Sequence, residues 1–451
     1  IMADGVADGA VVNSYGRVYL SSGGTLKAPE VNFSGQVYVS AGGLVADGAI
    51  NSLGRVFVRS GGTASGMVIS PSGSLTGEGN DNRFVSCVHL ANGYFHPGNN
   101  ARVEHATVGS GGALSCFAGN SMTHASVLSG GILAMNSAGR CTEVTVSAGG
   151  RVNAGVWGHD EDTLLTGTNA FGAFSISNGT AQNFVLAGGM ALPLYYYGSA
   201  ISTVMSSGGS VFVSFGAVAL HNTVSSYGRI MVYSGGTALD TEVSSGGSAF
   251  ADFCGTMANV TVRSGGVLYA SNYGRASGVT LESGAYGYAS NGGTVASLAV
   301  GGSFIASIGC LVSHLNIASG GYALIRRACA GTHISVASGG LLWAIDNTSI
   351  GDLDIAAGGT VTFMTMVEAS GVTLRESAFC SASGYCGLTQ VTVAPGASLY
   401  LSYYASASQV NVASGGLLYV GNTASALAVT SQEGAVISVN GGYVEYVTSG
   451  T

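Results

Sequence analysis

The chain has 451 residues, of which 47% are hydrophobic and only 8% are charged, and its formal net charge is −8. With 14 Lys and Arg in total, it lacks the basic clusters that nucleic acid requires, and its hydrophobic content excludes a disordered chain. No run reaches about 18 consecutive apolar residues. The opening IMADGVADGA has no basic segment before an apolar core. We therefore expect neither a transmembrane helix nor a signal peptide.

From the N-terminus onward, one pattern repeats with a period of about 19 residues. Each unit has an apolar residue shortly before a Gly or Ala bend, and small slips separate the runs. Because the pattern covers nearly the whole chain, we expect a single repeat domain over residues 1–451. The apolar position recurs as Val12, Val31, Ile50 and Ile69, then Val108, Val127 and Val146, then Val185, Met205, Val224, Val243, Val262 and Leu281, and finally Ile317, Val336, Ile355, Leu374, Val393 and Val412.

Inside each unit the apolar residues alternate with polar ones. Ile334 and Val336 precede a bend, and Leu399 and Leu401 follow one, which is the period-two pattern of half-buried strands. No segment has a sustained helical period, and a unit of this length is too short to contain a crossover helix. The sequence therefore predicts an all-β, right-handed parallel β-helix (β-solenoid) of roughly 22 coils, about 19 residues each. Coils about 4.8 Å apart would give a rod on the order of 100 Å long.

A row of aromatic residues lies three positions after the bends, between two inward-facing residues. If the coils stack in register, these rings form an outward stripe. Such a stripe either stabilises neighbouring strands or serves as a face for association or sugar binding. The candidate interaction residues are Tyr19, Tyr38, Phe57, Phe212, Phe250, Tyr269, Tyr288, Trp343, Tyr400 and Tyr419.

Two stretches break the repeat, and we expect residues 76–105 and 153–174 to be irregular loops. The second contains Asp160, Glu161 and Asp162, which are the only metal candidates, since Ca²⁺ prefers oxygen ligands. Their spacing matches no known calcium motif, so a solvated loop is the alternative. No repeat position carries acidic or basic residues consistently across neighbouring units, and the histidines are scattered. We therefore predict no cofactor and no enzymatic activity.

The eight cysteines contain no CxxC pair, so neither a zinc site nor a redox motif is indicated. Cys310 and Cys329 are separated by one repeat unit, which is one coil. Neighbouring coils place equivalent Cα atoms about 4.8 Å apart, within the range of a disulfide. We predict that these two residues are bridged if the protein is extracellular. Cys380 and Cys386 could close a small loop, whereas Cys116 occupies an inward, core position.

The unit V-x-S-G-G-x-h-x-h, where h is hydrophobic, is seen in VSSGGSAFAD from Val243, VRSGGVLYAS from Val262 and VASGGLLYVG from Val412. It resembles the 19-residue repeat of the self-associating autotransporter adhesins, such as the diffuse-adherence adhesin of Gram-negative bacteria. The resemblance implies a secreted, surface-displayed β-helix. It also implies O-glycosylation of repeat serines by a heptosyltransferase; the matching positions are Ser40, Ser60, Ser110, Ser207, Ser245, Ser264, Ser319, Ser338 and Ser414.

The predicted function is that of an extracellular structural adhesin, which mediates aggregation, biofilm formation and attachment to host cells. The expected partners are a second copy of the chain and a host-cell receptor or glycan. We expect the chain to be the passenger, or a fragment of it, without the translocator barrel of the family. Its eight cysteines are more than such passengers usually carry. A glycan-binding or glycan-processing β-helix, or a protomer of a surface fibre, remains the alternative, as does end-on rather than lateral association.

Overall fold

The computed structural model describes residues 1–89, 92–116, 119–135, 139–147, 149–154, 164–169 and 172–447. Every regular element in this part of the chain is a β-strand, and neighbouring turns pair in parallel. The fold is a parallel β-solenoid of about 21 turns with about 19 residues per turn. The fold class expected from the repeat is therefore confirmed.

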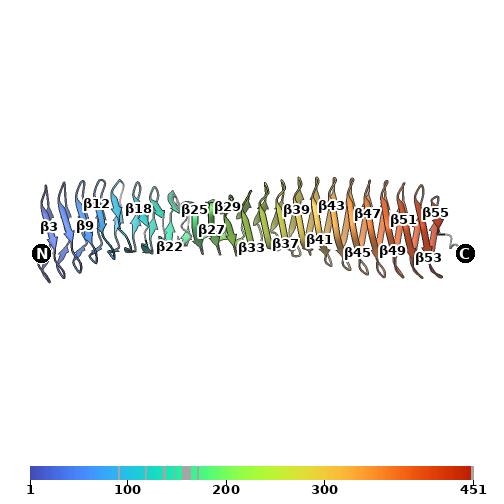
Figure 1. Cartoon of the computed structure of the whole chain (residues 1–451), viewed down its shortest axis with the longest axis horizontal. Coiled ribbons are helices and arrows are strands. Elements are labelled where there is room, and N and C mark those ends of the chain that lie inside the picture. Colours follow the sequence, from blue (N-terminus) through green and yellow to red (C-terminus); the bar gives the residue numbers. More distant parts are fainter. Residues whose placement is uncertain are drawn as a thin grey trace. The chain divides into compact units, whose positions relative to one another are not determined.

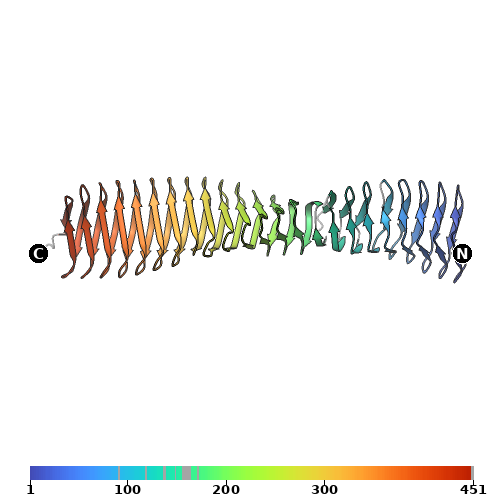
Figure 2. The same cartoon turned by 180° about the vertical axis from the view of Figure 1, so that it is seen from behind.

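Two compact units divide the chain. Unit 1 consists of Ile1–Thr223 and Tyr227–Ile230, and unit 2 consists of Val224–Ser226 and Met231–Thr451. In each unit the turns stack one upon another, with the strands of successive turns lying in ranks (Figure 1, with the opposite side in Figure 2). β31 (Thr223–Val224) and β32 (Arg229–Val232) contain residues of both units.

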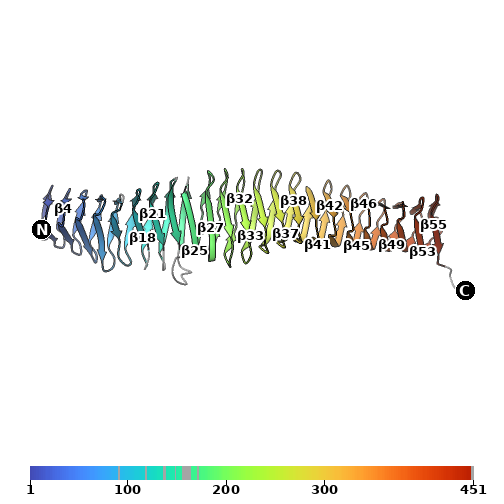
Figure 3. The ribbon, with the colours of Figure 1, turned by 90° about the horizontal axis from the view of Figure 1, so that it is seen from above.

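Each turn has three sides, which we call faces A, B and C. Face A is formed by one strand, and faces B and C by two short strands or by the two halves of a longer one. The longer strands bend at a residue with positive φ, such as Asn259 (54°), His333 (53°) or Asp352 (52°). Asn, Asp and His tolerate this conformation better than most residues, so the corner between faces B and C selects them. Figure 3 shows the ranks of strands from above.

The strands of unit 1 fall into these three sides. Face A comprises β3 (Arg17–Leu20), β6 (Gln36–Val39), β9 (Arg55–Arg59), β12 (Ser74–Glu78), β15 (Tyr94–His96), β18 (Ala113–Cys116), β21 (Ile132–Met135), β23 (Gly150–Ala154), β29 (Ser210–Val213) and the first parts of β25 (Gly172–Gln182) and β27 (Ala191–Ile201). Face B comprises the second parts of β25 and β27 with β1 (Val6–Asp8), β4 (Thr25–Lys27), β7 (Leu44–Ala46), β10 (Thr63–Ser65), β13 (Arg83–Val85), β16 (Arg102–Glu104), β19 (Ser121–Thr123) and β30 (Val218–Leu220). Face C comprises β2 (Val11–Val12), β5 (Glu30–Val31), β8 (Ala49–Ile50), β11 (Val68–Ile69), β14 (Val88–His89), β17 (Thr107–Val108), β20 (Ser126–Val127), β26 (Val185–Leu186) and β28 (Val204–Met205), while β22 (Arg140–Val146) and β24 (Leu164–Asn169) span faces B and C.

Unit 2 is more regular. Its face A comprises β34 (Ser248–Ala251), β36 (Val267–Ala270), β38 (Tyr286–Ser290), β40 (Ser303–Ser307), β42 (Tyr322–Arg326), β44 (Leu341–Ile345), β46 (Thr360–Met364), β48 (Phe379–Ser383), β50 (Ser398–Ser402), β52 (Leu417–Val420) and β54 (Val436–Val439). Long strands form its faces B and C: β33 (Thr237–Val243), β35 (Thr256–Val262), β37 (Arg275–Leu281), β39 (Thr294–Val300), β41 (Leu311–Ile317), β43 (Ala330–Val336), β45 (Ser349–Ile355), β47 (Glu368–Leu374), β49 (Gly387–Val393), β51 (Ser406–Val412), β53 (Ser425–Ser431) and β55 (Tyr443–Tyr446).

The core of unit 2 consists of columns, one residue per turn. Val336 pairs with Ile355, and Val393 pairs with Val412, so the repeated apolar position forms one inward column. All four side chains are fully buried, and each burial contributes about 1.5–3 kcal/mol relative to exposure. Because each turn contacts only its neighbours, stability accumulates from turn to turn.

The sequence interpretation of residues 76–105 as an irregular loop is wrong. Strands β13, β15 and β16 lie in this segment and pair in parallel with the turns on either side. One turn has an extra residue, since Thr63 pairs with Arg83. Apart from Asn82 and His89, which are buried, the charged and polar residues that suggested a loop occupy outward and corner positions, while Phe84 and Val103 fill the core.

The second expected loop, residues 153–174, is partly described. Strands β23, β24 and β25 account for residues 153–154, 164–169 and 172–174. The metal candidates Asp160, Glu161 and Asp162 lie outside the described residues.

Candidate interaction surface

Side chains of face A point alternately into the core and outward. In β36, Leu268 and Ala270 are buried, whereas Val267 and Tyr269 lie on the outside. Because the turns pair in register, an outward side chain packs against the same position one turn later. The predicted aromatic row occupies one of these outward columns.

In unit 1, three predicted residues form one stack. The ring centroids of Tyr19 and Tyr38, and those of Tyr38 and Phe57, are 5.0 Å apart. The guanidinium carbon of Arg59 lies 5.1 Å from the centroid of the Tyr38 ring, which is a cation–π contact. Phe212 of β29, another predicted residue of unit 1, pairs in register with Pro193 of β27.

In unit 2, Phe250, Tyr269 and Tyr288 form a second stack. Their successive centroids are 4.8 Å and 5.2 Å apart, with ring planes within 4° and 16° of parallel. The three residues occupy one register position in β34, β36 and β38. All three residues are partly buried, and an aromatic pair of this kind contributes about 0.5–1.5 kcal/mol beyond area burial.

A third aromatic group lies near the C-terminal end of unit 2. The ring centroid of Tyr400 is 5.4 Å from that of Phe379 and 5.2 Å from that of Tyr419. Earlier in unit 2, Trp343 of β44 is 38% exposed and packs edge-on against Tyr322 of β42, with ring centroids 6.2 Å apart. All of these rings lie on face A.

The outward aromatic stripe expected from the sequence is interrupted. One turn of unit 2 is shorter than its neighbours, so Tyr288 is followed in register by Ile305. Trp343 lies between Leu324 and Thr362. The predicted residues therefore form separate groups of stacked rings, divided by aliphatic and hydroxyl side chains.

Unit 2 carries two further sets of exposed aromatic residues that are not among the predicted interaction residues. One set occupies the first outward position of face A. The other lies at the corner between faces A and B. In the sequence, an aromatic residue just after a face A strand marks this set, as in SNYG and SGYCG. These residues are Tyr286 and Phe379 on face A, and Phe253, Tyr273, Tyr385, Tyr403 and Tyr404 at the corner.

Face A of unit 2 is almost free of charge. Within its described strands, β34 to β54, Arg326 is the single charged residue. The other outward side chains are aromatic, aliphatic or hydroxyl groups. Face A of unit 1 differs, because its strands carry Arg17, Arg55, Arg59 and Glu78.

Charged residues of unit 2 gather instead on and beside the long strands of faces B and C. Arg375 donates hydrogen bonds of 2.7 and 2.9 Å to both oxygens of Asp354, and these bonds raise the pKa of its guanidinium. Arg263 pairs with Glu242 at 2.8 Å. These pairs are about half exposed, so each contributes little to stability.

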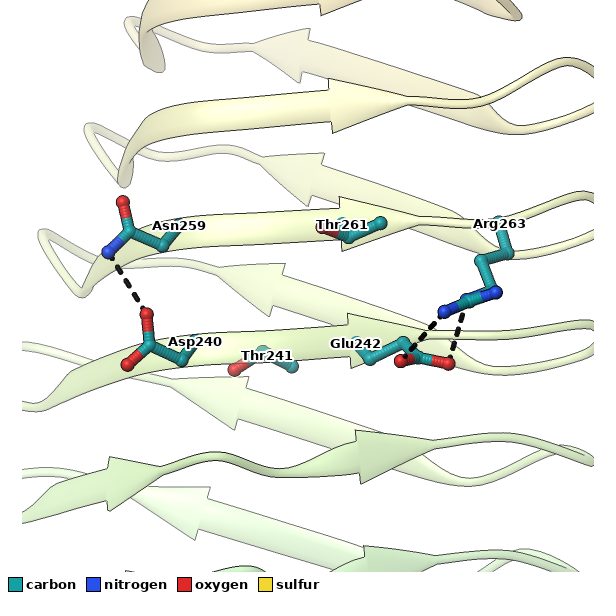
Figure 4. Close-up of a pocket in the computed structure, with 6 residues that line it drawn as sticks. All are labelled: Asp240, Thr241, Glu242, Asn259, Thr261 and Arg263. Atoms are coloured by element: carbon teal, nitrogen blue, oxygen red, sulfur yellow. Dashed lines mark hydrogen bonds and ion pairs between the residues drawn. The ribbon is translucent and has the colours of Figure 1, made fainter.

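An open hollow of about 340 Å³ lies beside the Arg263 pair (Figure 4). At its other end, Asn259 donates a hydrogen bond of 3.0 Å to Asp240, while Thr241 and Thr261 lie between. Its acidic groups are engaged with neighbouring side chains, and they are held apart at its two ends. This arrangement places no pair of carboxylates together for acid–base chemistry.

The corner between faces B and C carries columns of histidine. His105 stacks on His124 at 4.6 Å, and His124 forms an ion pair with Glu143. In unit 2, His314 stacks on His333 at 4.8 Å, and His333 lies 3.4 Å from Asp352. All occupy the positive-φ position of the bend, so the backbone conformation accounts for the residue types found there.

The eight cysteines are free thiols in the structure. The predicted pair lies side by side, since the backbone N–H of Cys310 is 3.2 Å from Sγ of Cys329. Hydrogen bonding from the Cys310 thiol lowers the pKa of Cys329 to about 7. Cys116 is fully buried, as expected from its inward position. The predicted bridge itself remains a prediction.

Among the described residues, no group of three or more His, Cys, Asp and Glu is arranged to hold a metal ion. The same part of the chain contains no helix with the length and apolar character of a membrane span.

Part of the chain matches a known protein family. Residues 166–228 match the family described as "Adhesin of bacterial autotransporter system, probable stalk". This segment is similar to the stalk of bacterial autotransporter adhesins. An autotransporter passenger is surface-exposed or secreted, in agreement with the expected location. No curated protein matches the chain. Among solved structures, it is similar to a TibC-catalysed hyper-glycosylated fragment of TibA, with 20% identity over 98% of both chains and a TM-score of 0.25.

Proposed function

We propose that this chain is a structural, non-enzymatic adhesin and that face A of unit 2 associates with face A of a second copy. Copies displayed on neighbouring cells would hold the cells together, which supports aggregation and biofilm formation. The same exposed repeats would contact a host-cell receptor or glycan. The observation that carries the proposal is the run of eleven face A strands with Arg326 as their single charge.

The dimensions of this face suit a protein–protein interface. Eleven strands about 4.8 Å apart, each of four or five residues at about 3.3 Å, give a face on the order of 750 Å². A stable interface of ordinary size buries about 800 Å² on each partner. Face A of unit 2 therefore has room for a specific contact between two copies.

The chemistry of the face also favours pairing with itself. Tyr, Trp and Phe supply large contact area, and the hydroxyls of Ser, Thr and Tyr can both donate and accept hydrogen bonds. Two copies of an uncharged face create no like-charge repulsion when they meet. An identical surface on both partners gives the two-fold arrangement that is commonest among homo-oligomers.

Repetition strengthens the association. Each turn contributes a weak contact, but contacts on one rigid stack engage together, so later contacts form at high effective concentration. Removing rings from the middle of the face would therefore weaken the complex more than removing the same area elsewhere.

Sedimentation velocity of the purified chain over a range of concentrations tests this proposal. We expect the wild type to associate and the double variant Tyr269→Ser/Tyr288→Ser to associate about 30-fold more weakly, because truncating two interface tyrosines removes about 2 kcal/mol. The matched control is Leu311→Ser/Leu427→Ser, which removes two exposed leucines from long strands. Equal weakening by both double variants, or no association of the wild type, would overturn the proposal.

A further inference from the structure

A second hollow, of about 420 Å³, opens at the corner between faces A and B of unit 2. It lies at the ends of β50 and β52. Tyr403 and Tyr419 form its aromatic walls, and Ser402, Asn422 and Asn440 contribute polar groups. The described residues that line it include no acidic or basic side chain. Its volume falls within the range of small-molecule sites.

A glycine, Gly421, is among the residues that line this hollow. The register places Gly421 between Ser402 and Asn440 in one outward column. Earlier turns fill the same position with Met364 and Ser383. A Cβ atom on Gly421 would lie 3.0 Å from Cε1 of Tyr419 and 3.2 Å from the carbonyl oxygen of Leu401.

The backbone does not require glycine at this position. Gly421 lies outside the set of glycines with positive φ, so an L-amino acid could adopt its conformation. Its backbone N–H continues the ladder of the sheet by donating to Leu401 at 2.8 Å. The glycine therefore lets the Tyr419 ring pack closely against the backbone, where a Cβ atom would crowd it, instead of relieving backbone strain.

The groups around this space suit a sugar ring. Tyr403 is 67% exposed, and the face of its ring can pack against the C–H face of a pyranose. Nδ2 of Asn440 donates a hydrogen bond of 3.2 Å to the Tyr419 hydroxyl and so steadies that ring. Asn422 and Ser402 offer donors and acceptors for sugar hydroxyls. Without a charged group, the hollow has nothing to pair with a carboxylate or sulfate.

We propose that the hollow at Gly421 binds a neutral pyranose unit of a glycan. This site gives the glycan contact of the proposed function a location and rests on that function, but it is separate from the association of two copies through face A, so the two can be lost separately. The aromatic walls supply apolar contact, and the amides and the hydroxyl fix the orientation of the sugar, as in other small-molecule sites.

Saturation-transfer NMR and calorimetric titration of the full chain test the proposal, with methyl glucoside, methyl galactoside, methyl mannoside and N-acetylglucosamine as neutral probes and sialic acid as an anionic probe. At least one neutral probe is expected to bind. Gly421→Ser places a side chain against the Tyr419 ring and so displaces this wall of the hollow, and Tyr403→Ala removes the other wall. Each should weaken binding at least tenfold.

Tyr273→Ala is the matched control, because this tyrosine is 69% exposed at the same corner of another turn. The affinity of this variant for the sugar should stay within twofold of the wild-type value. Sedimentation of Gly421→Ser should show unchanged association, which separates this site from face A. Absence of binding by every neutral probe, binding of sialic acid alone, or undiminished binding in Gly421→Ser and Tyr403→Ala would overturn the proposal.

Discussion

Phe250 and Tyr269 lie one turn apart on face A and stack with their ring centroids 4.8 Å apart and their planes within 4° of parallel. The pair shows how a strict repeat period converts single aromatic residues into a surface. Each ring contacts the next turn, so it stabilises the stack, and its remaining exposed area adds to the outward face. Stability and association can therefore be measured on the same residues.

Replacing Tyr269 by Ser should lower the free energy of unfolding by about 2 kcal/mol, because two stacked pairs, with Phe250 and with Tyr288, are lost together. Urea denaturation followed by circular dichroism measures this loss. Thr362→Ser alters the same outward column where it carries a hydroxyl residue, and it should change stability by much less. Equal effects of the two substitutions would show that the aromatic stack does not form in solution.

Association through face A should depend little on ionic strength, because salt screens charges and this face has almost none. The double variant Ser381→Lys/Ser398→Lys adds two like charges to each copy. It should associate more weakly than the wild type and recover in part as salt is added. Sedimentation at low and high salt measures both effects. A wild-type complex that dissociates steeply with salt would indicate that the charged faces B and C form the contact.

The sequence alone predicted the solenoid because the repeated apolar position is buried in most of the described turns. Val336 and Val412 belong to one inward column, and a column of this kind leaves a strict period in the sequence. Residues 76–105 were misjudged because their outward and corner residues are unusually polar, although Phe84 and Val103 keep the core pattern.

The surface was harder to predict. A shortened turn shifts the register so that Ile305 follows Tyr288, and small changes of turn length leave only a weak trace in the sequence. The hollow at Gly421 was missed because glycine is common at the bends. The sequence does not distinguish a glycine that the backbone needs from one that lets a neighbouring ring pack against the backbone.

A buried histidine gives unit 1 a pH dependence. His89 is fully buried in the face C column between Ile69 and Val108, and burial lowers its pKa from the usual 6.5. The unfolded state therefore binds the proton more readily than the folded state. The free energy of unfolding should therefore be highest above pH 6.5, and it should fall as the pH drops from 6.5 toward the pKa of His89 in the folded state.

Substituting His89 by Val should raise the melting temperature and reduce this loss, because valine matches the apolar column and does not titrate. Thermal unfolding of the wild type and the variant across this pH range gives the difference directly. An unchanged pH dependence in His89→Val would show that this imidazole does not carry the effect.

Cys310 and Cys329 should form a disulfide when the chain meets oxidised glutathione. Both thiols lose their protons, and their two electrons reduce glutathione disulfide to two glutathione thiols. Because the pKa of Cys329 is about 7, its thiolate fraction and the oxidation rate should rise as the pH increases through 7. Burial raises the pKa of Cys380, so this thiol should react more slowly.

Peptide mapping by mass spectrometry, with samples taken over time, identifies the bridge. The control Cys329→Ser should abolish the linked peptide and leave Cys310 reduced. Failure of the wild type to form a Cys310–Cys329 peptide under these conditions would contradict the predicted bridge.

The most direct test of the proposed association is photo-crosslinking from within face A. Tyr288 is replaced by p-benzoylphenylalanine, and the associated protein is irradiated and mapped by mass spectrometry. The account predicts crosslinks between copies that join residue 288 to peptides from the face A strands of unit 2. Crosslinks that instead join residue 288 to the long strands of faces B and C would contradict it.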